Sequence, residues 1–390
     1  MAASRHASII GAGLGGLTAA TALAQRGWSV RVHETAPDLR MFGAGIWLWE
    51  NGLRVLEAIG AFAETVSRTK QITAWERVDE KGRVLLRAGF DEADNRLYIP
   101  PRAHLYDALK AVAVNAGVEI ETSSTVVSAT PDGKIEREDG KTFKADLVVA
   151  ADGHRSRVRE SLGLTKEFRL KSEGCTRLLA SRPPDRPTTV STENWHGHRR
   201  LLYCPSSDEE MYVCLAMPLS DERGRTIPVD KEIWLKSFPH LADIIERIGD
   251  EARWDVLSHV SCTSWSSGRV AIVGDAAHAQ PPNLGQGANL AFANSLGLAV
   301  ALDEHEDIPT ALRAWEARER PLTNHTQRWS NIYGAIVGHW PLALSDIRSL
   351  TVWATGHSRW LDRRLSRAAR HAPTGTAMRA AQHRRLSGSD

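Results

Sequence analysis

Cysteine is scarce in this chain, which has four in 390 residues. No two of them form a Cys-x-x-Cys pair, the spacing typical of zinc sites and dithiol redox sites. Four scattered thiols are also too few for a disulfide scaffold of this length. We therefore expect no metal site and a reducing location, the cytoplasm. The four are Cys175, Cys204, Cys214 and Cys262.

Long apolar runs and an excess of one charge are also lacking. The longest apolar stretch, 288–302, is interrupted by Asn289, Asn294 and Ser295, and it is shorter than the roughly 20 residues of a membrane-spanning helix. The 49 basic and 47 acidic residues leave a net charge of +2, without the basic excess of a nucleic-acid-binding protein. The sequence therefore predicts neither a membrane span nor a nucleic-acid partner. Its length allows two or three domains.

The first residues have the pattern of a dinucleotide-binding βαβ unit. Apolar residues predict a strand at 7–10, a helix at 14–26 and a second strand at 30–33, which ends at Glu34. Between the first strand and the helix lies GAGLGG, residues 11–16. A strand, a glycine-rich turn, a helix and a terminal acid in this order predict a site for FAD or NAD.

Each part of this turn has a physical task in binding a dinucleotide. Gly11 permits the tight turn, Gly13 lets the backbone approach a pyrophosphate, and Gly16 lets helix and strand pack closely, while Gly15 lies in the same loop. The helix N-terminus adds free amides and a positive dipole. Glu34 can accept hydrogen bonds from the ribose hydroxyls and would repel a 2′-phosphate. We therefore expect an unphosphorylated adenosine.

Two later segments distinguish FAD from NAD. The stretch 145–159, ADLVVAADGHRSRVR, places Asp152 directly after a predicted strand. The stretch 269–289, RVAIVGDAAHAQPPNLGQGAN, combines a strand, Asp275, a proline-rich turn and a glycine-rich helix start. We call the first stretch the DG segment and the second the GD segment. Together with the GxGxxG turn, they resemble the three markers of the single-component, class A flavoprotein aromatic hydroxylases. The resemblance covers roughly residues 7–321.

The resemblance implies which residues hold FAD. The aspartate of the GD segment binds the ribityl chain, and the loop 281–287, with a helix that starts near Gly285, faces the isoalloxazine. A helix N-terminus there would stabilise the negative charge of reduced flavin. An arginine that opens the predicted helix 102–115 reaches the FAD. The implied cofactor-binding residues are Gly11, Gly13, Gly15, Gly16, Glu34, Arg40, Arg102, Asp152, Asp275, Pro282, Gly285, Gly287 and Ala288.

The substrate side resembles the members of this family that hydroxylate and open hydroxypyridine carboxylates. The segment 39–60, LRMFGAGIWLWENGLRVLEAIG, carries part of this resemblance, 200–212, RLLYCPSSDEEMY, carries a second part, and CTRLL at 175–179 supplies Arg177. Arginines at strand starts are also common on surfaces, and tyrosines in strands are common packing residues, so both interpretations stay open. The candidate catalytic residues are Arg200, Tyr212, Arg177 and Tyr203.

Two residues qualify this assignment. Ile72 stands where the hydroxypyridine-specific members have an active-site tyrosine, which puts the identical substrate in doubt. His278 follows the GD segment and could be a base, but a histidine hydrogen-bonded within the core is the expectation. If Arg200 binds a substrate carboxylate, its loss should weaken the binding of an acid about ten- to a hundredfold.

The strands and helices predict an α/β fold: a Rossmann-like FAD-binding domain, an inserted strand-rich substrate domain and a C-terminal helical segment. Eight arginines follow from position 359 onward and give the segment a basic tail. The expected ranges are 1–70, 102–160 and 262–330 for FAD, 71–101 and 161–261 for the substrate domain, and 331–390 for the C-terminal segment.

The resemblance implies an FAD-dependent monooxygenase. NADH or NADPH would reduce the flavin transiently, because no second GxGxxG indicates a nicotinamide domain, and O₂ would form a C4a-hydroperoxide that hydroxylates the ring. The expected partner is a small hydroxylated aromatic or N-heteroaromatic acid of the 3-hydroxypyridine carboxylate type, with or without ring opening. A salicylate- or hydroxybenzoate-type phenolic hydroxylase and a flavin reductase without oxygen insertion are the alternatives. The sequence does not indicate the oligomeric state.

Overall fold

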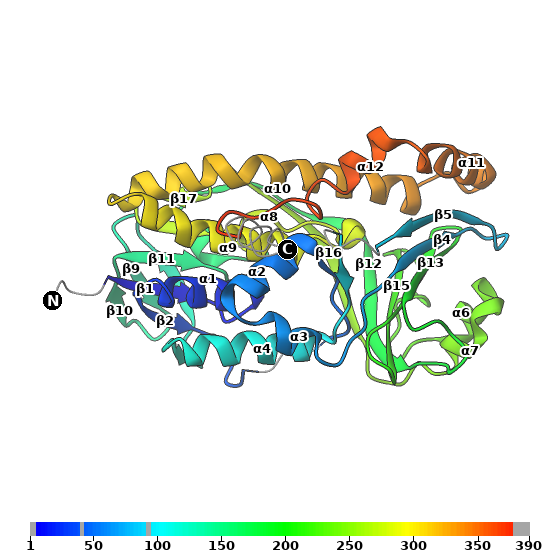
Figure 1. The fold of residues 1–390 in the computed structure, drawn as a ribbon, viewed down its shortest axis with the longest axis horizontal. Coiled ribbons are helices and arrows are strands. Elements are labelled where there is room, and N and C mark those ends of the chain that lie inside the picture. Colours follow the sequence, from blue (N-terminus) through cyan, green and yellow to red (C-terminus); the bar gives the residue numbers. More distant parts are fainter. Residues whose placement is uncertain (1–4, 40–42, 91–94, 377–390) are drawn as a thin grey trace, which may run out of the picture.

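Two β-sheets organise the molecule (Figure 1). The computed structural model describes residues 5–39, 43–90 and 95–376. Within these residues the first sheet has six strands, in the order β17 (Ser266–Ser267), β18 (Val270–Ile272), β11 (Leu147–Ala150), β1 (His6–Ile10), β2 (Ser29–His33) and β7 (Glu119–Glu121). The small sheet beside it consists of β8 (Val126–Ala129), β9 (Lys134–Arg137) and β10 (Thr142–Lys144).

The first sheet brings together strands that are far apart in the sequence. β1 pairs in parallel with β2 and with β11, and β11 pairs in parallel with β18. β11 and β18 are buried on both faces, which explains their continuous apolar sequences. The helices around them are α1 (Leu14–Ala24), α2 (Glu50–Ile59), α3 (Phe62–Val66), α4 (Arg102–Asn115), α5 (Arg157–Ser161), α8 (Asp275–His278) and α9 (Gly287–Glu304).

The second sheet is mostly antiparallel and lies at the other end of the molecule (Figure 1). Its order is β16 (Arg253–Cys262), β12 (Thr165–Ser181), β15 (Glu210–Pro218), β14 (Arg199–Pro205), β13 (Val190–His196), β4 (Ala74–Val78) and β5 (Val84–Gly89). β3 (Leu48–Trp49) and β6 (Leu97–Tyr98) form a separate two-stranded sheet. In the sequence, these two strands flank β4 and β5 of the second sheet.

The two faces of this second sheet have different neighbours. Successive side chains of a strand point to opposite faces, so on β14 Leu201 and Tyr203 pack on one side while Arg200 and Leu202 point to the other. The first side is covered by α6 (Lys231–Ser237), by the short 3₁₀ turn η1 (Pro239–Leu241) and by α7 (Ala242–Ile245). The second side faces the first sheet and lines a cavity.

A long helix connects the two halves. α10 (Ile308–Gly338) starts where the side chain of Asp307 accepts a hydrogen bond from the Thr310 amide at 3.0 Å, with a proline in its first turn. It packs on α9 and extends to the second sheet (Figure 1). After it follow η3 (Leu342–Leu344), α11 (Ser345–Gly356) and α12 (Arg359–Leu365). In the described part of the chain, we find no helix with the length and apolarity needed to cross a bilayer.

The predicted α/β fold, with an inserted strand-rich unit and a helical C-terminal segment, is confirmed. One helix start differs, because the helix expected near Gly285 begins at Gly287. Pro282–Leu284 forms a 3₁₀ turn, η2, and Gly285 closes it with a φ of +61°. This left-handed conformation is incompatible with the start of a right-handed helix.

Candidate active site

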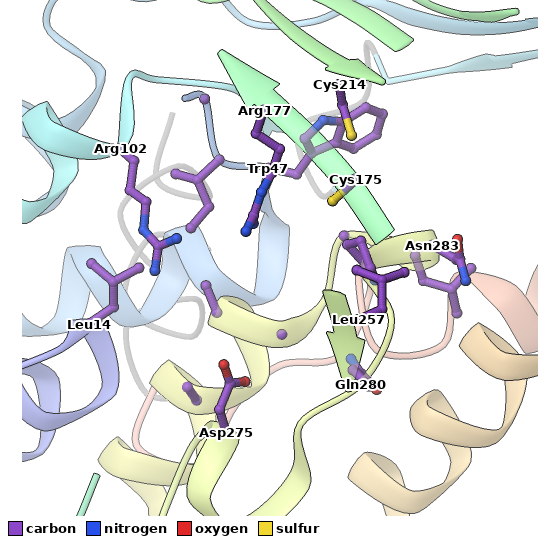
Figure 2. A pocket seen from close by; sticks show the side chains of 18 of the residues that line it. Leu14, Trp47, Arg102, Cys175, Arg177, Cys214, Leu257, Asp275, Gln280 and Asn283 are labelled. Atoms are coloured by element: carbon purple, nitrogen blue, oxygen red, sulfur yellow. The ribbon is translucent and has the colours of Figure 1, made fainter. Parts of the chain in front are cut away.

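A cavity of about 390 Å³ lies between the two sheets (Figure 2). The glycine-rich turn, the start of α4 and the loop before α9 form one half, and the inner face of the second sheet forms the other. Ligand sites commonly lie between domains and have volumes of this order. We call the first half the cofactor half and the second the substrate half.

The glycine turn has the shape that a pyrophosphate requires. Gly11 has a φ of +97°, and a Cβ there would lie 2.7 Å from the carbonyl oxygen of Ala151. A Cβ on Gly16 would overlap the carbonyl oxygen of Gly11, so α1 can only approach β1 this closely with glycine. A Cβ on Gly13 would meet no atom within 4 Å, and Gly13 lines the cavity. The turn is therefore tight on its inner side and open where a dinucleotide would lie.

Glu34 connects the end of β2 to the same turn. Its Oε2 accepts a hydrogen bond from the Ala12 amide at 2.7 Å, and its Oε1 accepts one from the Ala36 amide at 2.9 Å. A carboxylate has about four acceptor positions, so two bonds leave capacity for ribose hydroxyls. The ribose contact stays a prediction. The observed bonds show a further task, which is to hold the backbone of the glycine turn.

Two charged residues face each other across the cofactor half (Figure 2). Arg102 begins α4, and burial lowers the pKa of its guanidinium. Its Nε has no hydrogen-bond partner among the described residues. A buried guanidinium with an unsatisfied donor is costly unless an anion approaches it, so Arg102 fits the phosphates of FAD. Asp275 begins α8 on the other side, and its carboxylate lines the cavity.

The loop before α9 presents a helix start to the cavity. Gln286 is the N-cap of α9 but makes no capping hydrogen bond with its side chain, so the first amides of the helix stay open. Gly287 and Ala288 line the cavity there, as do Pro282 and Gly285. The partial positive charge of this helix end suits the anionic edge of a reduced flavin. The residues present therefore fit FAD.

The other cofactor predictions have different outcomes. Gly15 lines the cavity, and a Cβ there would lie 3.4 Å from the Cβ of Ala291. Asp152 does not line it, because its Oδ2 accepts a hydrogen bond from the Val158 amide at 3.4 Å, beside the start of α5. Burial raises the pKa of this carboxyl group. Arg40 lies outside the described residues.

The substrate half contains three of the four predicted catalytic residues. Arg177 on β12, Arg200 on β14 and Tyr212 on β15 all line the cavity. Burial raises the pKa of the Tyr212 hydroxyl well above its usual value, so this group stays protonated. Arg177 forms an ion pair with Asp255 of the neighbouring strand β16.

Arg200 has partners on three sides. Its Nη2 lies 3.5 Å from Oε2 of Glu173, and its Nη1 lies 3.6 Å from Oε1 of Glu193 and donates a hydrogen bond to Oδ1 of Asn283 at 2.9 Å. Burial alone would lower the pKa of Arg200, but the two carboxylates outweigh it and raise the pKa. Arg200 is therefore a charged, fixed part of the wall, and carboxylates of the protein already balance its charge.

Tyr203 does not reach the cavity. Its side chain points to the outer face of the second sheet, where its Oη accepts a hydrogen bond from Nη1 of Arg186 at 3.1 Å. The physical reason is the two-residue period of a strand, which sends positions 200 and 203 to opposite faces. The sequence already indicates this difference, because the two residues are three positions apart, and residues an odd number of positions apart in a strand point to opposite faces.

Ile72 and His278 are both buried away from the cavity wall. Ile72 is fully buried in the apolar cluster beside Trp75. His278 contacts Nδ2 of Asn294 through its Nε2 at 3.0 Å, and its ring packs on Trp265. Burial lowers the pKa of His278 to about 4. It is a neutral core histidine.

Several wall residues were not predicted. Trp47 and Trp75 meet edge to face with ring centroids 5.0 Å apart, and both line the cavity. Leu202 and Leu257 add apolar surface, and both polar atoms of the Gln280 amide are buried there without a partner among the described residues. Trp47, Leu202 and Gln280 lie within the segments that carry the resemblance, but the motifs assign them no role, and only the folded chain brings them together with Trp75 and Leu257.

This arrangement defines the class of the protein: a flavoprotein whose cofactor half fits FAD and faces a wall of aromatic, apolar and charged side chains. The chain belongs to the FAD binding domain family, which it matches over residues 5–328. It is 40% identical over 334 residues to the 2-heptyl-3-hydroxy-4(1H)-quinolone synthase of Mycobacteroides abscessus, which corresponds to 84% of this chain and 89% of that protein.

Two further relatives act on nitrogen heterocycles according to their names. The 6-hydroxynicotinate 3-monooxygenase of Bordetella bronchiseptica is 26% identical over 345 residues, 83% of this chain and 90% of that protein. The solved tetrameric form of 2-methyl-3-hydroxypyridine-5-carboxylic acid oxygenase has a TM-score of 0.85 and 34% identity, over 95% of this chain and 97% of that one. The predicted FAD-dependent aromatic monooxygenase is confirmed, as is the resemblance to the hydroxypyridine members.

Proposed function

We propose that this enzyme hydroxylates C3 of a 2-alkyl-4(1H)-quinolone, with O₂ and NADH or NADPH as co-substrates. FAD, when bound, supplies the transfer of electrons from the nicotinamide to O₂ and the insertion of one oxygen atom. The glycine turn, Arg102, Asp275 and the start of α9 would hold it. The 40% identity to a quinolone synthase supports the substrate class, and the charge of the substrate half supports it independently.

The pairing of the arginines carries the proposal. Asp255 balances Arg177, and Glu173 and Glu193 balance Arg200, so the two cations of the substrate half are already neutralised. A substrate carboxylate would add a negative charge close to buried carboxylates, which is unfavourable. A 4(1H)-quinolone is uncharged and does not meet this cost.

The wall residues have tasks that suit such a ring. The indole rings of Trp47 and Trp75 offer flat apolar surface, and Leu202 and Leu257 exclude water from the ring. The amide of Gln280 has a donor and an acceptor without partners. After rotation of its side chain toward the cavity, it would bond the ring N–H or the ring carbonyl and fix the orientation of an uncharged heterocycle.

A second candidate is the oxygenation of a 3-hydroxypyridine carboxylate, the substrate type expected from the sequence. The full-length structural likeness to the hydroxypyridine oxygenase favours it, as does the presence of Arg177 and Tyr212 in the cavity. For this substrate the ion pair between Arg177 and Asp255 would have to open.

A direct comparison of substrates tests the proposal. The FAD-loaded protein is incubated with 2-heptyl-4(1H)-quinolone or with 2-methyl-3-hydroxypyridine-5-carboxylate, and NADH or NADPH oxidation, O₂ uptake and product mass are measured. We expect the quinolone to gain one oxygen atom in step with NAD(P)H consumption. Gly13→Val serves as the control without FAD. Preferential turnover of the pyridine acid would select the second candidate, and peroxide without an oxygenated product from either ring would refute both.

A further inference from the structure

A second cavity lies beside the first, and no part of the proposed reaction uses it. It has a volume of about 310 Å³ and lies between the β4–β5 edge of the second sheet and the helices α10, α11 and α12. An apolar cavity of roughly 150 Å³ is already large enough to bind benzene in another protein. The volume here is about twice as large, which is more than the volume of a typical packing defect. We call it the helical cavity.

The wall of the helical cavity is mainly apolar. On α10 the contributing positions follow the helical period, so one face of the helix lines the cavity along two turns. The sheet edge and the last two helices line its other sides. Its apolar lining residues include Leu86, Phe90, Trp329, Ile332, Ile336 and Leu361.

The charged groups near its inner end are already paired. Nε of Arg77 donates a hydrogen bond to the Tyr333 hydroxyl at 2.8 Å, and this hydroxyl donates to Oε2 of Glu193 at 3.0 Å. The guanidinium of Arg77 also stacks on Trp75, 3.7 Å from the ring centroid. These groups therefore make no demand for a charged ligand, and the apolar surface determines what the cavity can bind.

The two cavities adjoin each other. Trp75 and Leu284 line both, so at these positions a single side chain separates the ring site from the helical cavity. Trp47 faces the first cavity and Trp49 the second, with ring centroids 5.5 Å apart. Trp75 and Leu284 thus form a shared wall, and a substituent on a ring in the first cavity would reach the second once these side chains move apart.

We propose that the helical cavity binds the linear alkyl chain of the ring substrate and so selects substrates by chain length. This inference rests on the proposed function, because it places the quinolone ring in the first cavity. Each methylene buried in an apolar site should improve binding about fourfold. Side chains of α10 and α11 would then determine specificity although they lie outside the ring site.

A series of 2-alkyl-4(1H)-quinolones from methyl to heptyl tests this inference. Their dissociation constants are measured from the absorbance change of the bound flavin, in wild type, Ile336→Trp and Leu350→Trp. Ile336 lines the cavity, whereas Leu350 on α11 is 62% exposed and does not. In wild type we expect the dissociation constant to fall about fourfold for each methylene. Ile336→Trp should reduce the methyl-to-heptyl ratio at least tenfold, and Leu350→Trp should leave it unchanged.

The FAD content of each variant reports whether it is folded. A wild-type dissociation constant that does not depend on chain length, or an unchanged ratio in Ile336→Trp, would overturn the inference while leaving the proposed function intact. If no quinolone binds, crystals of the holoprotein soaked with 1-iodoheptane decide between the two. Anomalous iodine density in the helical cavity would support an alkyl site without the quinolone reaction, and its absence would reject the alkyl site as well.

Discussion

Replacing either Gly13 or Gly16 with alanine should separate cofactor binding from folding. The two glycines lie three residues apart in one turn, yet their surroundings differ. Gly13 has φ −71° and ψ 178°, which alanine adopts without strain, and its Cβ would meet no atom of the protein. At Gly16 the Cβ would overlap the carbonyl oxygen of Gly11. The first methyl group would therefore occupy space that FAD needs, and the second would force β1 and α1 apart.

The expected magnitudes follow from these contacts. Gly13→Ala should leave the apoprotein as stable as wild type or about 0.4–1 kcal/mol more stable, because alanine restricts the unfolded chain. It should weaken FAD binding about ten- to a hundredfold, equivalent to one lost charge-assisted hydrogen bond to the pyrophosphate. Gly16→Ala should lower the free energy of unfolding of the apoprotein by about 1–3 kcal/mol.

Urea unfolding of the apoproteins and titration with FAD, followed by flavin fluorescence, measure both quantities. The reasoning would be refuted if Gly13→Ala bound FAD with wild-type affinity. It would also be refuted if the two variants destabilised the apoprotein equally, because the turn would then have no open side.

Three further predictions concern single side chains. Arg200→Ala leaves Glu173 and Glu193 buried without their cation and should lower the free energy of unfolding by about 3–5 kcal/mol, measured in urea; no change would show that water reaches them. Tyr203→Phe removes a hydroxyl on the outer face of the sheet, so kcat/KM should stay at the wild-type value, and a large loss would contradict its placement. The pKa of His278 falls from 6.5 to about 4 on folding, so the unfolded state binds more protons between these values. About 3 kcal/mol of stability should be lost as the pH falls from 6.5 to 4, and unfolding curves of His278→Asn should lack this share.

Local sequence patterns located the glycine turn and the start of α4 in the cofactor half, but they also indicated Asp152, which does not line the cavity. The turn at 11–16 and the helix that begins at Arg102 depend on residues close together in the chain, and glycine leaves few alternative geometries. Strand periodicity also located β1, β2 and β11. The βαβ pattern of β1, α1 and β2 predicts parallel pairing, and β11 is recognisable by its continuous apolar sequence.

The substrate half depends on contacts that the sequence does not contain. Arg200 was correctly placed at the cavity, but its partners come from β12, β13 and the loop before α9, and only the sheet register determines that they meet. Because of these partners, Arg200 is not a free cation available to a substrate carboxylate; its charge is already balanced by carboxylates of the protein. The position of Tyr203 depends on strand alternation alone: it lies three residues after Arg200 on β14, so its side chain points to the opposite face of the sheet.

The order of strands in the first sheet has a consequence for synthesis of the protein. β1 lies between β2 and β11, and β11 lies between β1 and β18. β1 therefore gains its second neighbour at residues 147–150, whereas β11 gains its second only at residues 270–272, when most of the chain exists. The cofactor half likewise combines Gly13 with Asp275 and Gly287. A ribosome that has translated the glycine turn has made less than a tenth of the chain, and the nascent protein cannot enclose FAD until residue 287 has left the exit tunnel. FAD capture is therefore a late event, and before it the apolar strands of the sheet must rely on chaperones or on each other.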